Sequence, residues 1–252
     1  MAYRLLLTTQ NVWRKLSLII LKNLQKLSLK AITVIAIDGP SASGKGTVAQ
    51  LVADKLDFHY LDSGAIYRIV ALAARRMDIG WQAAELLGEL ASKLTIQFKN
   101  GDIYLNNDLI TEQIRTEEMS RGASEVAVHT AVRAALLNLQ HNFRQAPGLV
   151  ADGRDMASVV FPDAKLKIFL TASTEIRAER RYKQLIANQL KNKGLAADYA
   201  QILADLQQRD LRDSARSASP LIQTPDALLL DTNQRNILQA VDFVLNAYKK
   251  LA

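Results

Sequence analysis

The chain has 252 residues, a formal net charge of +7 and no cysteine. This length suffices for the core of one α/β domain with insertions. The lack of cysteine excludes disulfides, zinc–thiolate sites and cysteine nucleophiles, and it agrees with a reducing cytoplasm. The three histidines, His59, His129 and His141, are not spaced as metal ligands, so we interpret them as surface or partly buried residues.

The positive charge is concentrated at the N-terminus. Residues 1–30 contain six basic residues and no acidic one, which leaves 26 basic and 25 acidic residues in the rest of the chain. This near balance argues against nucleic acid as a partner of the main body. We predict that residues 1–31 form a basic amphipathic extension, which either frays, packs on its own domain, or binds a membrane surface or an anionic partner. Its apolar residues recur at three- and four-residue steps: Trp13, Leu16, Ile20, Leu24 and Leu27.

The extension has no apolar run that could cross a bilayer. Its longest uninterrupted run is Leu18–Leu21, whereas a spanning helix needs about 20 apolar residues. No small-residue cleavage site precedes the strand expected at Ile32. We therefore expect neither a transmembrane segment nor a secretory signal.

A strand, a glycine-rich loop and a helix follow one another from Val34 to Leu56. The apolar run Val34–Ile37 predicts a strand buried on both faces, and helical spacing of apolar residues starts near Gly44. The glycines between them let backbone N–H groups surround phosphate oxygens, while Lys45 reaches the terminal phosphates. The predicted phosphate-binding residues are Gly39, Pro40, Ser41, Ala42, Ser43, Gly44, Lys45, Gly46 and Thr47.

This loop departs from the usual P-loop pattern at one position. Serine or threonine normally follows the lysine directly, whereas here Gly46 intervenes before Thr47. The Gly-Lys-Gly-Thr form resembles nucleoside monophosphate kinases more than GTPases or motor ATPases.

A second strand-to-helix junction begins at Phe58. The pattern predicts a strand over Phe58–Leu61 and then a helix, so that Asp62, Ser63 and Arg68 lie near the carboxyl edge of the sheet, where α/β proteins bind ligands. Alternatively, Asp62 or Ser63 is only the N-cap of that helix.

In the middle of the chain, the spacing of the apolar residues changes twice. Residues 94–110 alternate around Asn100-Gly101, which predicts a β-hairpin inserted outside the main sheet. One long helical pattern then runs from Thr116 to about Arg144. Ser124 and Arg133 do not share a face of such a helix, so a common ligand requires a break, which we expect at His129-Thr130.

Another buried strand, Leu149–Ala151, leads into the polar loop Asp152-Gly153-Arg154-Asp155. An arginine next to a carboxylate suits a ligand that carries both a phosphate and a hydrogen-bonding base. The alternative is an ordinary surface turn. A further strand is predicted over Leu166–Leu170.

The C-terminal third is rich in arginine. A helix from about Thr174 carries Arg177, Arg180 and Arg181, and a second helix follows Gly194. In the second helix, Arg209, Arg212 and Arg216 are spaced to line one face, which Asp213 joins. Such a face is either solvated or part of a lid that closes over phosphates. The last strand and helix are predicted over Ala227–Leu230 and Ile237–Leu251.

These blocks together resemble bacterial cytidylate kinases, and the resemblance covers essentially Ile32 to the C-terminus. The resemblance rests on five blocks: Gly-Pro-Ser-Ala-Ser-Gly-Lys-Gly-Thr (39–47), Leu-Asp-Ser-Gly-Ala-Ile-Tyr-Arg (61–68), Ala-Asp-Gly-Arg-Asp-Met (151–156), Val-Phe-Pro-Asp-Ala (160–164) and Arg-Asp-x-Arg-Asp-Ser-x-Arg (209–216). The first block alone indicates only phosphate binding. The Asp-Ser-Gly-Ala-Ile-Tyr-Arg and Asp-Gly-Arg-Asp blocks, together with the hairpin insertion, are far more specific. The resemblance implies an α/β P-loop kinase domain over 32–252, with a central parallel sheet flanked by helices. It also implies an NMP-binding insertion at about 92–145, which contains the hairpin, and a lid at about 182–212. The chain departs from the family at 186–193 and in the N-terminal segment.

The resemblance implies transfer of phosphate from MgATP to CMP and dCMP. It implies that Ser124, Arg133 and Asp155 contact the cytosine, and that Arg68, Arg154 and Arg216 surround the acceptor phosphate. Asp213 would hold the sugar with Arg209 beside it, and Ser63 would lie in the same pocket.

Charge neutralisation dominates the expected chemistry, because an acceptor phosphate needs no strong base but must approach a second polyanion. Arg177, Arg180 and Arg181 are candidates to follow the transferring charge, and Thr47 and Asp62 are candidates for Mg²⁺. The alternatives are a P-loop kinase of another nucleoside monophosphate or small molecule, and a regulatory nucleotide-binding protein with a basic arm. We expect a cytoplasmic monomer that binds ATP and CMP or dCMP.

Overall fold

The computed structural model describes residues 32–99, 101–192 and 198–251. The predicted N-terminal extension and part of the predicted lid lie outside these residues. Among the helices of the described ranges, none combines the length and apolar character that crossing a bilayer requires.

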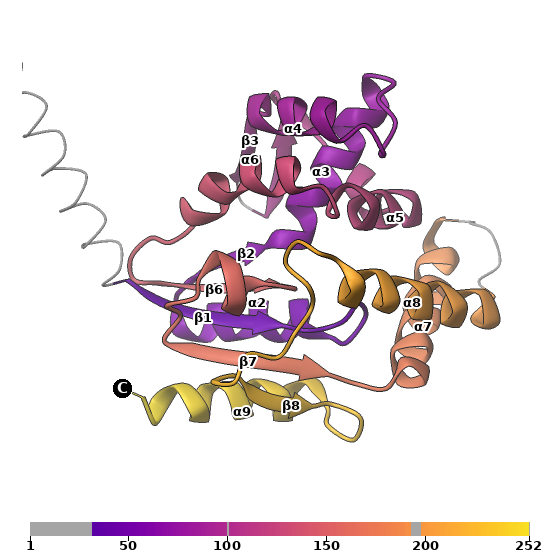
Figure 1. The fold of residues 1–252 in the computed structure, drawn as a ribbon. Helices are drawn as coiled ribbons and strands as arrows, with labels where there is room; N and C mark the ends of the chain where they lie inside the picture. The colour runs from indigo at the N-terminus through magenta and orange to yellow at the C-terminus, as the bar shows by residue number, and fades with distance from the viewer. Residues whose placement is uncertain (1–31, 100, 193–197, 252) are drawn as a thin grey trace, which may run out of the picture.

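The centre of the molecule is a five-stranded sheet in the order β2-β6-β1-β7-β8, and all neighbouring strands are parallel (Figure 1). This confirms the predicted central parallel sheet, and the edge strands lie within one residue of their predicted positions. The strands are β1 (Thr33–Asp38), β2 (His59–Asp62), β6 (Gly148–Gly153), β7 (Leu166–Thr171) and β8 (Leu228–Asp231).

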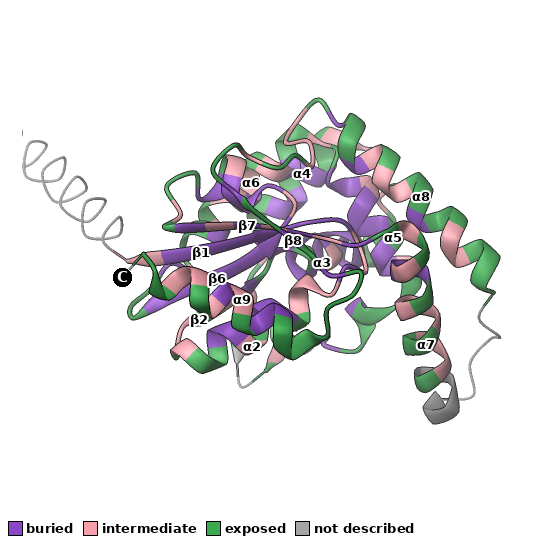
Figure 2. Ribbon diagram, turned by 90° about the horizontal axis from the view of Figure 1, so that it is seen from below, coloured by how far each residue is buried: buried purple, intermediate pink, exposed green. Residues whose placement is uncertain are grey.

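Helices cover both faces of the sheet, which is why β1 is apolar at successive positions. Ile35 and Ile37 pack with α2 (Lys45–Leu56) and α9 (Ile237–Lys249), while Val34 and Ala36 belong to the core on the other face, with α3 (Ser63–Arg76). Figure 2 shows β1 and β6 as a buried layer inside the molecule, whereas the edge strands β2 and β8 are largely exposed. The sheet therefore holds its loops on a rigid, doubly covered platform.

Strand β6 is longer than the sequence predicts. The polar loop was expected to begin at Asp152, but Asp152 and Gly153 remain in the strand, because β1 and β2 pair with it on both sides. In the register, Asp152 lies opposite Asp62 of β2, and Gly153 lies opposite Asp38 of β1. Three acidic side chains thus reach the same edge of the sheet.

The predicted hairpin is confirmed as part of a separate antiparallel sheet, whose third strand the sequence pattern did not indicate. Phe98 of this sheet packs edge-on against Phe143, with 5.1 Å between ring centroids. The elements of this region are α4 (Ala84–Lys93), β3 (Ile96–Lys99), β4 (Asp102–Leu105), β5 (Asp108–Leu109) and η1 (Gln113–Arg115).

The long helical pattern is divided into α5 (Glu117–Val126) and α6 (Thr130–His141), which confirms the expected break. His129 is the residue directly before α6, and one nitrogen of its ring lies 2.8 Å from the Trp81 carbonyl oxygen. Arg133 in the first turn of α6 donates to the Ala127 carbonyl oxygen at 3.1 Å. The break therefore turns α6 so that Arg133 points back toward the end of α5.

Two helices that lie side by side complete the fold, α7 (Thr174–Asn192) and α8 (Tyr199–Ala215). A short helix, η2 (Met156–Val160), follows β6. Helix α8 ends at Ala215, and Arg216 is the residue directly after it (φ −60°, ψ 132°), from which the chain leaves the helix.

Candidate active site

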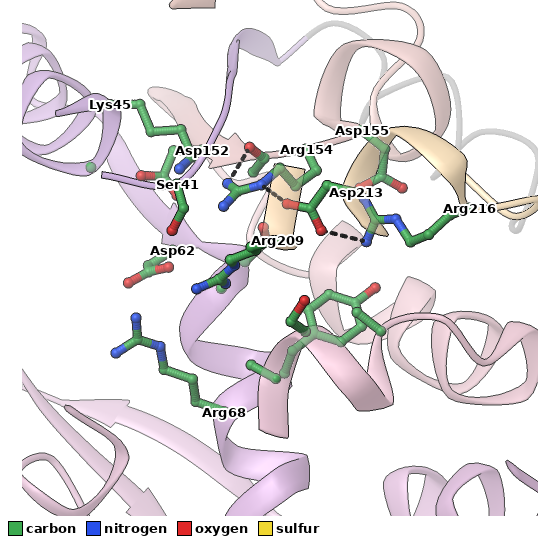
Figure 3. A pocket seen from close by; sticks show the side chains of 18 of the residues that line it. Ser41, Lys45, Asp62, Arg68, Asp152, Arg154, Asp155, Arg209, Asp213 and Arg216 are labelled. Carbon is green, nitrogen blue, oxygen red and sulfur yellow. Dashed lines mark hydrogen bonds and ion pairs between the residues drawn. The ribbon is translucent and has the colours of Figure 1, made fainter. Parts of the chain in front are cut away.

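A cavity of about 210 Å³ lies at the carboxyl edge of the sheet, where β1, β2 and β6 end. Six basic side chains and four carboxylates line it, together with small and hydroxyl residues of α3 and α5. Figure 3 shows the charged side chains converging on it from several elements. The charged residues are Lys45, Arg68, Arg133, Arg154, Arg209, Arg216, Asp62, Asp152, Asp155 and Asp213.

The loop between β1 and α2 forms one wall of this cavity. Gly39 begins the loop, and a β-carbon there would lie 1.9 Å from the Leu170 carbonyl oxygen, so only glycine fits beside β7. Helix α2 starts at Lys45, directly after Gly44 in the left-handed conformation, and its free N–H groups face the loop. The arrangement is that of a phosphate-binding loop.

Lys45 and Asp152 stand together at this wall. Burial lowers the pKa of the Lys45 ammonium, and Arg154 adds to the effect while Asp152 opposes it. Burial also raises the pKa of Asp152, and the nearby Asp62 raises it further. Within the described ranges, the hydrogen bond of the Lys45 ammonium is a long one of 3.4 Å to the Pro40 carbonyl oxygen, so an anionic ligand would suit it.

The glycine that separates Lys45 from Thr47 has a spatial reason. A β-carbon at Gly46 would lie 3.0 Å from Asp152 Oδ2 and 3.5 Å from the Tyr60 hydroxyl. The Tyr60 hydroxyl donates to the same Asp152 oxygen at 3.3 Å. The Tyr60–Asp152 pair therefore occupies the space that a serine or threonine after the lysine would need.

An ion-pair network lines the opposite side of the cavity. Arg154 Nε donates to Asp213 Oδ2 at 2.8 Å, and Arg216 lies 3.8 Å from the other oxygen of the same carboxylate. Burial alone would raise the pKa of Asp213, but Arg154, Arg216 and Arg209 outweigh it and hold the pKa below its usual range. Asp213 thus stays charged and holds two guanidinium groups at the cavity.

The third group of polar residues lies between α5, α6 and the end of β6. Arg133 forms an ion pair with Asp155, and its guanidinium lies 5.4 Å from the centre of the Tyr67 ring. Ser124 of α5 lines the same space, and its buried hydroxyl has no hydrogen-bond partner among the residues that the structure describes. The break between α5 and α6 therefore brings together Ser124 and Arg133, which a continuous helix would have separated.

Several donors in the cavity lack partners in the described part of the chain. These are Arg209 Nε, and Nε and Nη2 of Arg216. Buried polar groups in native proteins are normally satisfied by protein, water or ligand. Unpaired guanidinium nitrogens beside a phosphate-binding loop suit an anionic ligand.

Comparison with known proteins assigns the chain to a family. A family model described as cytidylate kinase matches residues 35–250. The chain belongs to the cytidylate kinase family. A cytidylate kinase of Polynucleobacter asymbioticus is 58% identical over 221 residues, which are 88% of this chain and 98% of that protein. A cytidylate kinase of Chromobacterium violaceum is 55% identical over 219 residues, 87% of this chain and 96% of that protein.

Two solved kinases are more distant from this chain in sequence. A gluconokinase from Sinorhizobium meliloti aligns with 87% of this chain and 93% of its own, at 14% identity and a TM-score of 0.43. A shikimate kinase from Bacteroides thetaiotaomicron gives 15% identity and a TM-score of 0.42, over 88% of this chain and 99% of its own. The assignment to the cytidylate kinase family rests on the sequence matches.

Three arginines of α7 that the sequence singles out lie outside this cavity. Arg177 is buried, pairs with Asp210 of α8 and donates to the Ser41 carbonyl oxygen at 3.1 Å. Arg180 donates to the Ser43 carbonyl oxygen at 3.0 Å. In this member of the cytidylate kinase family, both arginines thus hold the outer side of the phosphate-binding loop.

Arg181 instead lines a second, larger cavity of about 700 Å³ between α5, α7 and α8. It forms an ion pair with Glu117 at the start of α5. The two cavities share Ser41, Ala42, Arg68, Ser124 and Arg209, so they form one continuous cleft.

Several residues of the cleft were not among the predicted site residues, and two of those in the first cavity have polar side chains. These two are Asp152 and Tyr67. Asp152 lies in the same sequence block as Arg154 and could have been found by aligning β6 with β2, since Asp62 ends the neighbouring strand. Tyr67 has no such signal, because its spacing on α3 is that of an ordinary core residue.

Proposed function

We propose that the chain transfers the terminal phosphoryl group of ATP to CMP and dCMP, giving ADP and the corresponding diphosphates. The observation that carries the proposal is the continuity of the two halves of the cavity: the phosphate-binding loop with Lys45 on one side, and the arginines around Asp213 on the other. Two phosphate groups can thus be held next to each other.

The donor half binds ATP through the residues 39–47. Backbone N–H groups of the loop and the positive end of α2 contact its phosphates, and Lys45 neutralises the terminal ones. Loop residues such as Pro40, Ser43 and Gly44 contribute backbone groups rather than side chains. Arg177 and Arg180 support the proposal indirectly, because their bonds to loop carbonyls keep the loop in a binding conformation.

The acceptor half binds the nucleoside monophosphate. Arg68, Arg154 and Arg216 hold its phosphate, and Ser63 lies beside them. Asp213 contacts the sugar, with Arg209 next to it. Ser124, Arg133 and Asp155 contact the cytosine, a role supported by the unpaired Ser124 hydroxyl and by the donor and acceptor atoms of the Arg133–Asp155 pair.

The residues accelerate the reaction by position and charge. The attacking atom is an anionic phosphate oxygen, so its repulsion from ATP is the main obstacle. Guanidinium and ammonium groups in a partly dry cavity reduce that repulsion and align the two nucleotides in line. Arg181, facing the larger cavity, would follow the charge of the transferring group. We further infer that residues of about 92–145 form the NMP-binding insertion and about 182–212 the lid.

Magnesium accompanies ATP in this proposal. In proteins Mg²⁺ is commonly held by one or two carboxylates and the substrate phosphates, not by a protein cage. Within the described ranges no group of three or more His, Cys, Asp or Glu side chains could hold a metal, which fits an ion that arrives with its nucleotide. Asp62 on the cavity wall and Thr47, exposed on α2, would hold it directly or through water. The ion would neutralise phosphate charge.

A coupled assay of ADP production with each nucleoside monophosphate tests the proposal. We expect CMP and dCMP to be used with kcat/KM at least about 10-fold above UMP and AMP, since the base contacts are specific hydrogen bonds. Lys45→Ala should lower kcat on the order of 10²-fold or more, while Lys183→Ala, at an exposed residue of α7, should not. Turnover of AMP or UMP in preference to CMP would overturn the substrate, and full activity of Lys45→Ala would overturn the mechanism. We also propose that the chain is cytoplasmic and that it is a monomer. Light scattering of the purified protein tests the second of these proposals.

A further inference from the structure

Asp38 is a buried carboxylate that lines neither cavity. It is the last residue of β1, next to Gly39, and its side chain is only 2% exposed. Its Oδ1 accepts the backbone N–H of Met156 at 2.9 Å, and its Oδ2 accepts that of Ala157 at 2.8 Å. Both carboxylate oxygens therefore accept hydrogen bonds from the backbone that follows Asp155.

In the described part of the chain, Asp38 is the acceptor of both N–H groups. They are the first two of η2, whose internal hydrogen bonds begin with Val159 and Val160 donating to the Asp155 carbonyl oxygen at 2.9 and 3.1 Å. Met156 and Ala157 are also buried, at 0% and 3% exposure, so water cannot replace the carboxylate. Asp38 thus fixes the peptide on the C-terminal side of Asp155.

The backbone after Asp155 is fixed by the hydrogen bonds to Asp38, and the Asp155 side chain is fixed by its ion pair with Arg133. Its backbone is neither helical nor regularly extended (φ −145°, ψ 23°). A residue at such a junction takes its orientation from its neighbours, since no regular element imposes one. Rotation of the Met156 peptide would move both Asp155 and Arg154.

We propose that Asp38 is a positioning residue: from the start of the phosphate-binding loop it sets the orientation of Arg154 and Asp155 in the acceptor half of the site. This inference rests on the proposed function, because it assigns the acceptor nucleotide to those residues. Asp38 ties the donor loop to the acceptor loop through two hydrogen bonds to one carboxylate. The position of Asp38 at the end of β1 therefore helps to set the distance between the two nucleotides.

The test uses Asp38→Asn, which keeps the shape of the side chain but leaves only one acceptor for two N–H donors. We expect KM for CMP to rise about 10-fold while KM for ATP changes less than about 2-fold, and the preference for CMP over UMP to fall. Ile168→Val, a core change in β7, serves as the control for a general loss of stability. Equal changes in both KM values, or the same pattern in Ile168→Val, would overturn the proposal.

A double-mutant cycle shows whether Asp38 acts through the acceptor loop. In an Asp155→Asn background, Asp38→Asn should change the CMP-to-UMP preference by less than about 2-fold, because the residue it positions is already altered. Full additivity of the two changes would contradict the inference.

Hydrogen exchange of the unaltered chain covers the case in which Asp38→Asn does not fold. The Met156 and Ala157 amides should exchange slowly without nucleotide and slow little further with CMP, because Asp38 holds them beforehand. If CMP slowed their exchange by more than about 10-fold, the substrate and not Asp38 would order the loop. This measurement needs no turnover, so it separates failure of this inference from failure of the proposed function.

Discussion

Gly46 faces the carboxylate of Asp152 so closely that a β-carbon at Gly46 would lie 3.0 Å from Asp152 Oδ2. The contact joins the first turn of α2 to the end of β6. It explains why this phosphate-binding loop carries a glycine where most P-loops carry a hydroxyl residue, since Tyr60 and Asp152 fill that space.

Adding a side chain at Gly46 should therefore damage the site. We expect Gly46→Ala to lower kcat/KM about 10-fold, because the methyl group pushes Asp152 away from Tyr60 and Lys45. Steady-state kinetics with ATP and CMP measures this. Gly80→Ala is the matched control, since a β-carbon there meets only Gln82 Oε1 at 3.7 Å. Wild-type kinetics of Gly46→Ala would show that the contact is easily relieved.

Base discrimination should depend on Asp155. We expect Asp155→Ala to lower kcat/KM for CMP about 10- to 100-fold while use of UMP falls less, because a lost hydrogen bond to the base is replaced by an unpaired Arg133. Competition between CMP and UMP in one assay reports the ratio directly. Asp226→Ala, at an exposed carboxylate paired with Lys167, should leave the ratio unchanged. An unaltered ratio in Asp155→Ala would remove that residue from base recognition.

Stability should depend on pH through Asp38. Burial raises the pKa of Asp38 to about 6, although the N–H groups of Ala157 and Met156 lower it; Asp155 raises it and Arg154 lowers it. Between about pH 4 and 6 the folded chain therefore binds more protons at this carboxyl than the unfolded chain does. The resulting contribution to stability is present below pH 4 and is lost as the pH rises through 6.

Urea unfolding of the wild type and Asp38→Asn at pH 4, 5, 6 and 7 measures this contribution. The free energy of unfolding of the wild type, relative to Asp38→Asn, should fall by about 2 kcal/mol over that range. Parallel pH profiles would mean that Asp38 has the same pKa in the folded and the unfolded chain.

Removal of residues 1–31 should leave catalysis intact. None of the predicted site residues lies in that segment, and β1 begins only at Thr33. We expect kcat and both KM values within about 2-fold of the full chain, with a lower isoelectric point because six basic residues are removed. Loss of activity in a folded, shortened chain would show that the segment takes part in the reaction.

The sequence predicts the framework well because its signals are local. The buried run Val34–Ile37, the Asn100-Gly101 turn and the break before Thr130 each follow from neighbouring residues, and all three are found. The contribution of Asp152 and Asp38 depends on register between strands that are far apart in the chain, which periodicity does not report. Helical spacing also accounts for Arg209, Asp213 and Arg216, which line one cavity although α8 ends at Ala215.

The excess of basic over acidic side chains in the smaller cavity has a practical consequence. A site with several guanidinium groups discriminates poorly among small tetrahedral oxyanions, since sulfate and inorganic phosphate offer the same oxygens. Such ions at buffer concentrations should compete with the acceptor nucleotide. Assays in phosphate or sulfate buffer would then give a higher apparent KM for the acceptor nucleotide than assays without these ions.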